Sequence, residues 1–280
     1  MTSREKPPAY YFYSSILFML LVFVSFFLLD HVCPFPESVV SGDPWWKTHP
    51  LIVIVTVIDN NNFSQGPRGP SETISGFSSK KFFNITKKAL ENKERYADFY
   101  GYEVAVKDVK DWTRSTSWAK IPALLEAMDE FPSSHWFWFM DSYLIVSNPV
   151  QIANYVLQNV TRASQMLIGY DCHGLNANSF FIKNTEWSRN FLNTVHKREL
   201  FERFEEEGIV MQMLIDYEVI EAVDKIHFVP FRSLNALPLA HDCGKDERYL
   251  WHKDDFVFNL SGCNTNAECE KVIREIGMFD

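Results

Sequence analysis

Residues 136–149 read WFWFMDSYLIVSNP, and this stretch predicts the fold more directly than any other part of the chain. An aromatic run leads into Asp141 and an apolar run follows it, so we expect a buried β-strand that ends at a carboxylate. Because apolar residues flank Asp141 on both sides, it should be partly buried, where an unpaired carboxylate is costly. A metal ion, a lysine or backbone N–H groups should therefore satisfy it.

Strand-like and helical patterns alternate along the rest of the chain. This alternation predicts an α/β fold with a mostly parallel sheet and helices on both faces. We expect Ser117 to cap the helix that starts there. Strands are expected at 51–58, 102–109, 136–141, 165–170 and, after a loop, within 174–184; helices are expected at 83–100, 117–131, 150–158, 186–204 and 209–221.

Three carboxylates each follow the end of an apolar strand: Asp59, Asp141 and Asp171. In sheets of this kind, ligands bind beyond the carboxyl ends of the strands. The three residues could line one cleft, although any one of them could instead be a solvated turn residue.

The composition is that of a globular protein. The chain has 280 residues, of which 46% are hydrophobic and 15% aromatic, enough for one α/β domain of moderate size behind a membrane segment. Its formal net charge of −9, without a basic stripe, argues against a nucleic-acid partner.

The N-terminal region predicts a membrane anchor. Residues 9–29 carry no charge and are long enough to span a bilayer as a helix. A cleaved signal peptide is the alternative, but no small-x-small cleavage pattern follows. Arg4 and Lys6 precede the segment, so residues 1–8 should form a cytosolic tail. The proline-containing residues 30–50 would be a stem, and residues 51–280 the lumenal domain.

Two further features fit a lumenal domain. Cys263 and Cys269 could close a short disulfide loop in an oxidising compartment, or be free buried thiols. No cysteine spacing suggests structural zinc. N-glycosylation sequons occur at Asn62, Asn84, Asn159 and Asn259.

Several longer motifs carry a resemblance to a known family. The most specific is GLNANSFFIKNTEWS at 174–188; the others are NKERYA at 92–97 with Gly101-Tyr102, WAKIP at 118–122, the strand 136–141 with Asn148-Pro149, and SGC at 261–263. From about Leu51 to Ile276, the chain resembles glycosyltransferase family 34. This family includes fungal α-1,2-galactosyltransferases, subunits of α-1,6-mannosyltransferase complexes and plant xyloglucan xylosyltransferases.

The resemblance implies a GT-A fold, a single-pass type II Golgi membrane protein, and retaining transfer from a nucleotide sugar such as UDP-galactose or GDP-mannose. It also implies Mn²⁺, which neutralises the leaving diphosphate. Asp141 matches the first aspartate of the metal motif, and Lys120 would lie near the diphosphate. Asn176 and Ser179 match the loop that lines the sugar pocket. The remaining matches, Asn92 and Tyr96, would contribute to cofactor binding or only to helix packing.

Three positions depart from the family pattern. Tyr143 replaces the second metal-binding aspartate, Asn259 replaces a histidine, and Gly208 replaces a glutamine. A neutral phenol is a poor ligand for Mn²⁺. The site could therefore work without metal, through Lys120 and backbone dipoles, or it could be inert. It could also recruit a substitute ligand from Glu206, Glu207, Asp171 or Asp255.

Two functions follow from these residues and the resemblance. The first is a Golgi hexosyltransferase that acts on glycoprotein glycans. The second is a non-catalytic subunit of a Golgi mannosyltransferase complex. A membrane-anchored lectin has no specific support in the sequence.

Overall fold

The computed structural model describes residues 51–58, 83–108, 116–150, 152–158, 160–198, 211, 222–238, 241–260 and 266–276. The expected anchor at 9–29 and stem at 30–50 lie outside these residues, as does Gly208. Within the described part of the chain, no helix has both the length and the apolar character needed to cross a bilayer.

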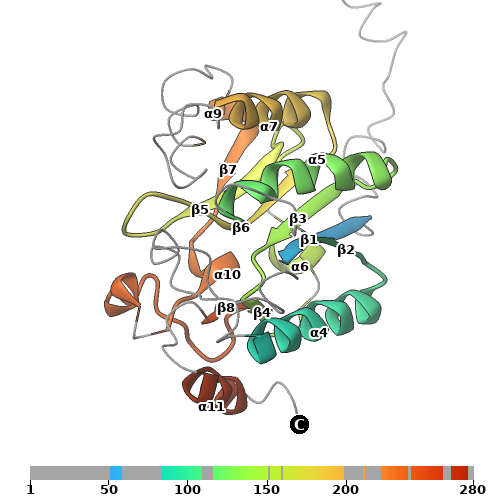
Figure 1. Cartoon of the computed structure of the whole chain (residues 1–280). Coiled ribbons are helices and arrows are strands. Elements are labelled where there is room, and N and C mark those ends of the chain that lie inside the picture. Colours follow the sequence, from blue (N-terminus) through green and yellow to red (C-terminus); the bar gives the residue numbers. More distant parts are fainter. Residues whose placement is uncertain are drawn as a thin grey trace, which may run out of the picture. The chain divides into compact units, whose positions relative to one another are not determined.

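A six-stranded sheet forms the centre of the fold (Figure 1). Its strand order is β2-β1-β3-β6-β5-β7. Only β6 runs antiparallel to its neighbours, so the other five strands point the same way. The expectation of a mostly parallel sheet is confirmed. The strands are β1 (Ile52–Ile58), β2 (Glu103–Asp108), β3 (Trp136–Met140), β5 (Met166–Tyr170), β6 (Leu175–Lys183) and β7 (Ile226–Phe228).

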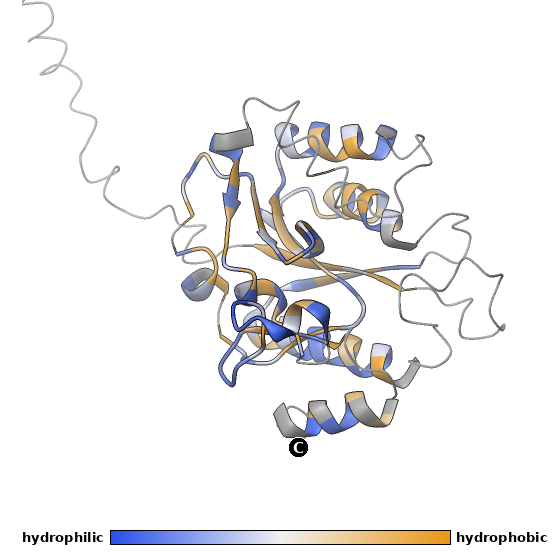
Figure 2. Cartoon of the chain, turned by 90° about the vertical axis from the view of Figure 1, so that its left-hand side faces the viewer, coloured by the Kyte–Doolittle hydropathy of each residue, from blue (hydrophilic) through white to orange (hydrophobic). Residues whose placement is uncertain are grey.

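Helices cover both faces of this sheet, which explains why β3 is buried at every position. On one face lie α5 (Lys120–Glu130) and α7 (Glu186–Arg198), packed on a core that includes Phe137 and Phe139. On the other face lie α4 (Phe83–Tyr100) and the short α6 (Ile152–Tyr155), packed on Trp136 and Trp138. Figure 2 shows the sheet between these helices.

A smaller sheet follows the carboxyl end of β3. Strand β4 (Leu144–Val146) pairs antiparallel with β8 (Val257–Asn259). Helix α10 (Arg232–Asn235) leads into this region, and Ala236 N–H bonds to Val257 O over 3.0 Å. The remaining elements are a 3₁₀ turn η2 (Thr116–Ala119), α9 (Ala222–Lys225), a 3₁₀ turn η4 (Asp242–Lys245) and α11 (Asn266–Ile276).

Some element boundaries differ from those expected. The helix expected from Ser117 begins at Lys120, after the 3₁₀ turn, and its N-cap residue Ala119 makes no side-chain cap. The helix expected at 150–158 has only one turn, and the segment expected as loop plus strand at 174–184 is a strand for nearly its whole length. The helix expected at 186–204 is observed as far as Arg198, and 209–221 lies outside the described residues except for Met211.

A disulfide joins Cys172 to Cys243, with their Cα atoms 5.5 Å apart. Of the two alternatives for Cys269, the bridge to Cys263 is wrong and the buried free thiol is confirmed, since this residue of α11 packs in a hydrophobic cluster as a free cysteine. Sequence proximity suggested that bridge, whereas the fold brings together cysteines 71 residues apart.

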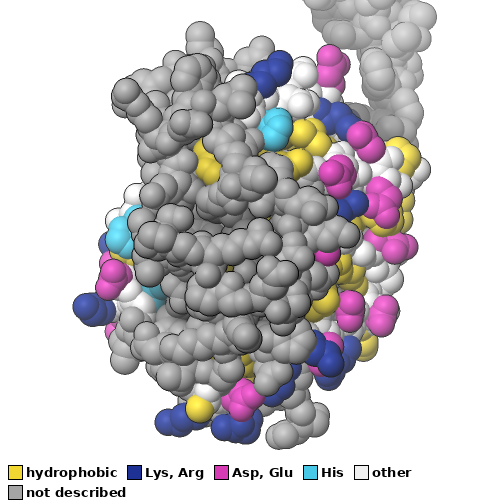
Figure 3. All heavy atoms as spheres, viewed as in Figure 1, with side chains coloured by type: hydrophobic (Ala, Val, Ile, Leu, Met, Phe, Trp, Pro, Cys, Tyr) yellow, Lys and Arg dark blue, Asp and Glu magenta, His cyan; other side chains and the backbone are white. Residues whose placement is uncertain are grey.

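Charges of both signs are mixed on the described surface of the face seen in Figure 3. Lys107 on β2 contacts Glu130 of α5 over 2.7 Å and Glu126 over 3.8 Å. Such exposed pairs contribute little to stability.

Candidate functional site

The carboxyl edge of the sheet gathers most of the candidate residues. Asp141 follows β3 and Asp171 follows β5, and these strands run in the same direction. Strand β6 starts at this edge, since Leu175 pairs with Tyr170 and Ser179 pairs with Met140. The sheet thus brings Asp141, Asp171 and the 174–179 segment to one edge, as expected; Asp59 lies outside the described residues.

Asp141 is held by partners from within the chain. The Tyr143 hydroxyl donates to its Oδ2 over 2.9 Å, and Lys120 Nζ lies 3.8 Å from its Oδ1. Its backbone N–H donates to Asn178 O over 2.9 Å, which ties the residue to β6. The carboxylate therefore has a hydroxyl donor on one oxygen and an ammonium group near the other.

Lys120 lies in the first turn of α5 and is only 2% exposed. Its ammonium group donates to Ala177 O over 3.0 Å and lies 5.0 Å from the centre of the Phe139 ring. Because α5 packs on the sheet, the ammonium group of Lys120 lies at the strand edge that carries Asp141. A buried positive charge at this place stabilises the negative charge of the carboxylate.

A second buried lysine, which sequence reasoning missed, lies on the other face of the sheet. Lys93 on α4 is fully buried and donates to Leu144 O over 2.6 Å, with a longer contact of 3.5 Å to Ser142 O. Burial lowers its pKa to about 7, and attraction to Asp141 opposes that shift. The burial of Lys93 could have been predicted from the sequence, because this residue falls between Ala89 and Tyr96 on the apolar stripe of α4.

A chain of amide hydrogen bonds connects the remaining candidates. Asn259 Nδ2 donates to Asn235 Oδ1 over 2.7 Å, and Asn235 Nδ2 donates to Asn176 Oδ1 over 2.8 Å. Asn176 Nδ2 then donates to Asp171 Oδ2 over 2.7 Å. Asn259 is 1% exposed, so the side chain of this sequon asparagine is inaccessible in the folded protein. We call these four residues the amide chain; it links β8, α10, β6 and the end of β5.

Asn92 and Tyr96 contact the backbone that follows β3. Asn92 Nδ2 donates to Val146 O over 3.1 Å and its Oδ1 accepts from Val146 N over 2.7 Å, so the amide pairs with β4 as a neighbouring strand would. The Tyr96 hydroxyl donates to Val150 O over 2.7 Å. These contacts with the backbone fit the packing alternative rather than a ligand site.

Ser179 supports the core beneath the site. Its hydroxyl accepts a 3.0 Å hydrogen bond from Trp138 Nε1, and the side chain is 2% exposed. Trp138 stacks between Phe181 and Phe256, with ring centres 5.0 and 5.2 Å away. Ser179 therefore fixes an aromatic stack rather than facing a cleft.

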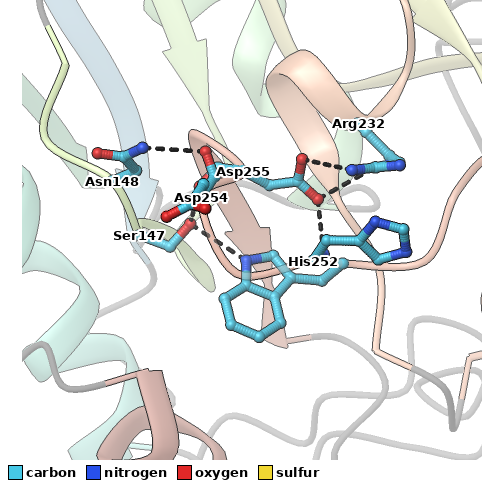
Figure 4. Close-up of polar contacts among 7 residues, drawn as sticks. Ser147, Asn148, Arg232, His252, Asp254 and Asp255 are labelled. Atoms are coloured by element: carbon cyan, nitrogen blue, oxygen red, sulfur yellow. Dashed lines mark hydrogen bonds and ion pairs between the residues drawn. The ribbon is translucent and has the colours of Figure 1, made fainter.

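The residues after β4 anchor the segment before β8 (Figure 4). Asn148 Nδ2 donates to Asp254 O over 2.9 Å, and the Ser147 hydroxyl donates to Asp255 O over 2.6 Å. Asp254 has a φ of 99°, a conformation that a non-glycine residue adopts only when its surroundings impose it. The Asn148-Pro149 motif thus has a structural role that its sequence did not reveal.

Comparison with known proteins identifies the family. A model of the galactosyl transferase GMA12/MNN10 family matches residues 48–161 and 148–270. The chain belongs to this family. The probable alpha-1,6-mannosyltransferase MNN10 of Saccharomyces cerevisiae is 27% identical, over 84% of this chain and 67% of its own length. An alpha-1,2-galactosyltransferase of Schizosaccharomyces pombe is 20% identical, over 85% of this chain and 69% of its own.

A solved structure also matches this member of the GMA12/MNN10 family. It is a glycosyltransferase involved in the glycosylation of the major capsid of PBCV-1, with a TM-score of 0.57 at 15% identity. The match covers 81% of this chain and the whole of that one. It shows that the two share the glycosyltransferase fold.

The residues of this GMA12/MNN10 family member do not fit a divalent metal at Asp141. Mn²⁺ needs several oxygen or imidazole ligands, but here a hydroxyl donor and an ammonium group already neutralise the carboxylate. The two described candidates for a substitute ligand are also engaged, Asp171 by Asn176 and Asp255 by Arg232. Glu206 and Glu207 lie outside the described residues.

Elsewhere in the described residues, one group has the spacing of metal ligands, formed by Cys172, His173 and Cys243. It is not a metal site as it stands, because the two cysteines share a disulfide.

Proposed function

We propose that the protein is a hexosyltransferase that transfers galactose or mannose from UDP-galactose or GDP-mannose to glycans of glycoproteins. In this proposal it works as a single-pass Golgi membrane protein with its body in the lumen. The transfer retains the anomeric configuration, as the family resemblance implies.

Family membership and the placement of the motifs support the activity. The relatives are described as a probable mannosyltransferase and a galactosyltransferase. Asp141, Lys120 and Asn176, which the resemblance assigns to the donor site, belong to segments that meet at one edge of the sheet. This is the edge at which α/β folds of this kind bind their ligands.

The Cys172–Cys243 disulfide supports the proposed lumenal location, because disulfides persist in oxidising compartments and are rare in the cytosol. The uncharged segment at 9–29 adds to this, since it has the length of a membrane anchor.

The donor binds without a divalent metal at Asp141 in our proposal. The support is the pairing of Asp141 with Tyr143 and Lys120. Lys120 places an ammonium group 3.8 Å from Asp141 Oδ1, and Lys93, with a pKa of about 7, adds positive charge when it is protonated; this charge favours an anionic diphosphate.

The same pairing also favours a second candidate function. Asp141 is paired with residues of the same chain, and Tyr143 and Asn259 stand where the family pattern has metal-binding Asp and His. Both features suit a non-catalytic subunit of a mannosyltransferase complex. Such a subunit would keep the fold for assembly and would not bind a donor.

Donor titration separates the two functions. The full-length chain, purified in mild detergent, is titrated with UDP-galactose and with GDP-mannose by calorimetry, with Mn²⁺ and then with EDTA. We expect one donor to bind equally in both conditions, and Lys120→Met to weaken it. Lys107→Met, which removes a lysine on β2 away from Asp141, is the matched control. Folded protein that binds neither donor would contradict the enzyme and favour the subunit.

A further inference from the structure

A pocket of about 560 Å³ opens beside the carboxyl end of β5. Its volume falls within the range of roughly 300–1,000 Å³ that is usual for small-molecule sites. Separate segments contribute to it: the end of α6 with Tyr155, the end of β5 with Tyr170, residues 229–233 after β7, and Arg248, Tyr249 and Asp255 before β8. The side chains that define its chemistry are those of Tyr155, Tyr170, Phe231, Arg232, Tyr249 and Asp255.

The aromatic side chains of the pocket are fixed by packing. Phe231 and Tyr249 meet edge to face with ring centres 5.5 Å apart, and Tyr155 lies 5.3 Å from Phe256. Aromatic rings offer a flat apolar face, and tyrosine adds a hydroxyl at the rim. This combination suits a sugar ring, which has apolar C–H faces and hydroxyl groups at its edge.

Arg232 and Asp255 supply the polar part of the pocket (Figure 4). Arg232 Nε and Nη2 donate to the two oxygens of Asp255 over 3.0 and 2.8 Å, and Asp255 Oδ2 also accepts from His252 N. The hydrogen bonds from Ser147 and Asn148 described above fix the backbone of this segment. The polar groups are thus preorganised, which lowers the entropy lost when a ligand binds.

The charge balance of the pocket selects against a diphosphate. Arg232 is paired with Asp255, and Arg248 at the rim is paired with Asp246 over 2.6 Å. No lining arginine therefore carries an unneutralised charge for an anion. A neutral polyhydroxyl ligand, by contrast, can exchange hydrogen bonds with a paired guanidinium and carboxylate.

The pocket is built partly from chain segments that also carry the amide chain of the candidate donor site. Tyr170 of its lining precedes Asp171 of the amide chain, and Arg232 starts the helix that ends at Asn235 of the same chain. We propose that this pocket is the acceptor subsite and binds a neutral hexose residue of the glycan. This inference rests on the proposed transferase function and extends it to named acceptor-binding residues.

The test uses methyl α-D-mannopyranoside and methyl α-D-galactopyranoside as probes, observed by saturation-transfer NMR on the full-length chain. We expect one of them to bind, and Tyr249→Ala to weaken binding by at least about tenfold. Phe99→Ala is the matched control, because Phe99 is an aromatic residue that is 77% exposed and does not line the pocket. Thermal melts establish that both variants fold.

Donor titration of the same samples distinguishes this inference from the proposed function. Hexoside binding that Tyr249→Ala removes, while donor binding stays unchanged, would support the acceptor subsite. Donor binding without any hexoside binding, or hexoside binding that Tyr249→Ala leaves intact, would overturn the subsite alone. Hexoside binding at Tyr249 without donor binding would overturn the transferase and hence the acceptor role.

Discussion

The Tyr143 hydroxyl donates a 2.9 Å hydrogen bond to Oδ2 of Asp141, at the position where a metal motif would carry a second carboxylate. Lys120 approaches the other oxygen at 3.8 Å. A substitution that removes a metal ligand has thus also supplied a donor to the carboxylate that remains. Asp141 is better described as a paired carboxylate than as a damaged metal site.

Tyr143→Asp should create metal affinity, because it replaces the hydroxyl donor with a second carboxylate two residues from Asp141. We expect Mn²⁺ binding, measured by electron paramagnetic resonance, to appear in this variant and to strengthen in Tyr143→Asp/Asn259→His. Tyr143→Phe is the control: it loses the hydrogen bond, destabilises the fold by about 1–2 kcal/mol and gains no metal binding. Equal Mn²⁺ affinity in all these variants would contradict the view that position 143 decides whether a metal binds beside Asp141.

Asn92→Ala should destabilise the fold by about 2–3 kcal/mol, because it leaves the buried N–H and C=O of Val146 without their partner. The control is Asn193→Ala on the exposed side of α7, with an expected change within about 0.5 kcal/mol. Both are measured by urea unfolding. Equal losses in the two variants would show that Asn92 does not hold β4.

Lys93 should make stability depend on pH. Its pKa is about 7 in the folded chain and 10.5 without the burial, so between these values the unfolded chain binds one more proton. The free energy of unfolding should therefore rise with pH from about 7 upward, by at most about 1.4 kcal/mol per pH unit from this group, and the contribution should be constant below pH 7.

Subtracting the curve of Lys93→Met isolates that contribution. Lys87→Met, at a lysine that is 64% exposed on the same helix, serves as the control and should keep the pH dependence of the wild type. If the free energy of unfolding of the wild type and of Lys93→Met changed with pH in parallel, the lowered pKa of Lys93 would be refuted.

Replacing both Cys172 and Cys243 by serine should lower stability by about 3–4 kcal/mol, since their bridge closes a long loop. Cys269→Ala removes a buried free thiol instead and should cost about 1 kcal/mol. Non-reducing peptide mapping checks the pairing directly. A peptide that links Cys269 to another cysteine would contradict it.

The main elements of the fold could be predicted because their residues are buried on both sides. The apolar runs that became β1 and β3 and the helical spacing of α4 are local signals, and the structure confirms them. Strands β4 and β8 have only three residues each and form through a long-range pairing, which no local pattern shows.

The sequence predicted where in the fold the candidate site lies, but not which side chains contact one another there. The strand ends placed Asp141 and Asp171 on one edge, as expected from the direction of β3 and β5. The position of Lys93 on the apolar stripe of α4 was a local signal, but its contacts with β4, like those of Asn235 on α10, join distant parts of the chain and could not be read from residue spacing. The same holds for the disulfide, whose cysteines are 71 residues apart.

The most direct test of the central claim is Mn²⁺ binding to the wild-type chain beside Asp141→Asn. The paired state of Asp141 predicts no stoichiometric Mn²⁺ binding in the wild type by electron paramagnetic resonance, and the same spectrum for Asp141→Asn. One bound Mn²⁺ per chain that Asp141→Asn abolishes would contradict the claim that Tyr143 and Lys120 have taken the place of the metal.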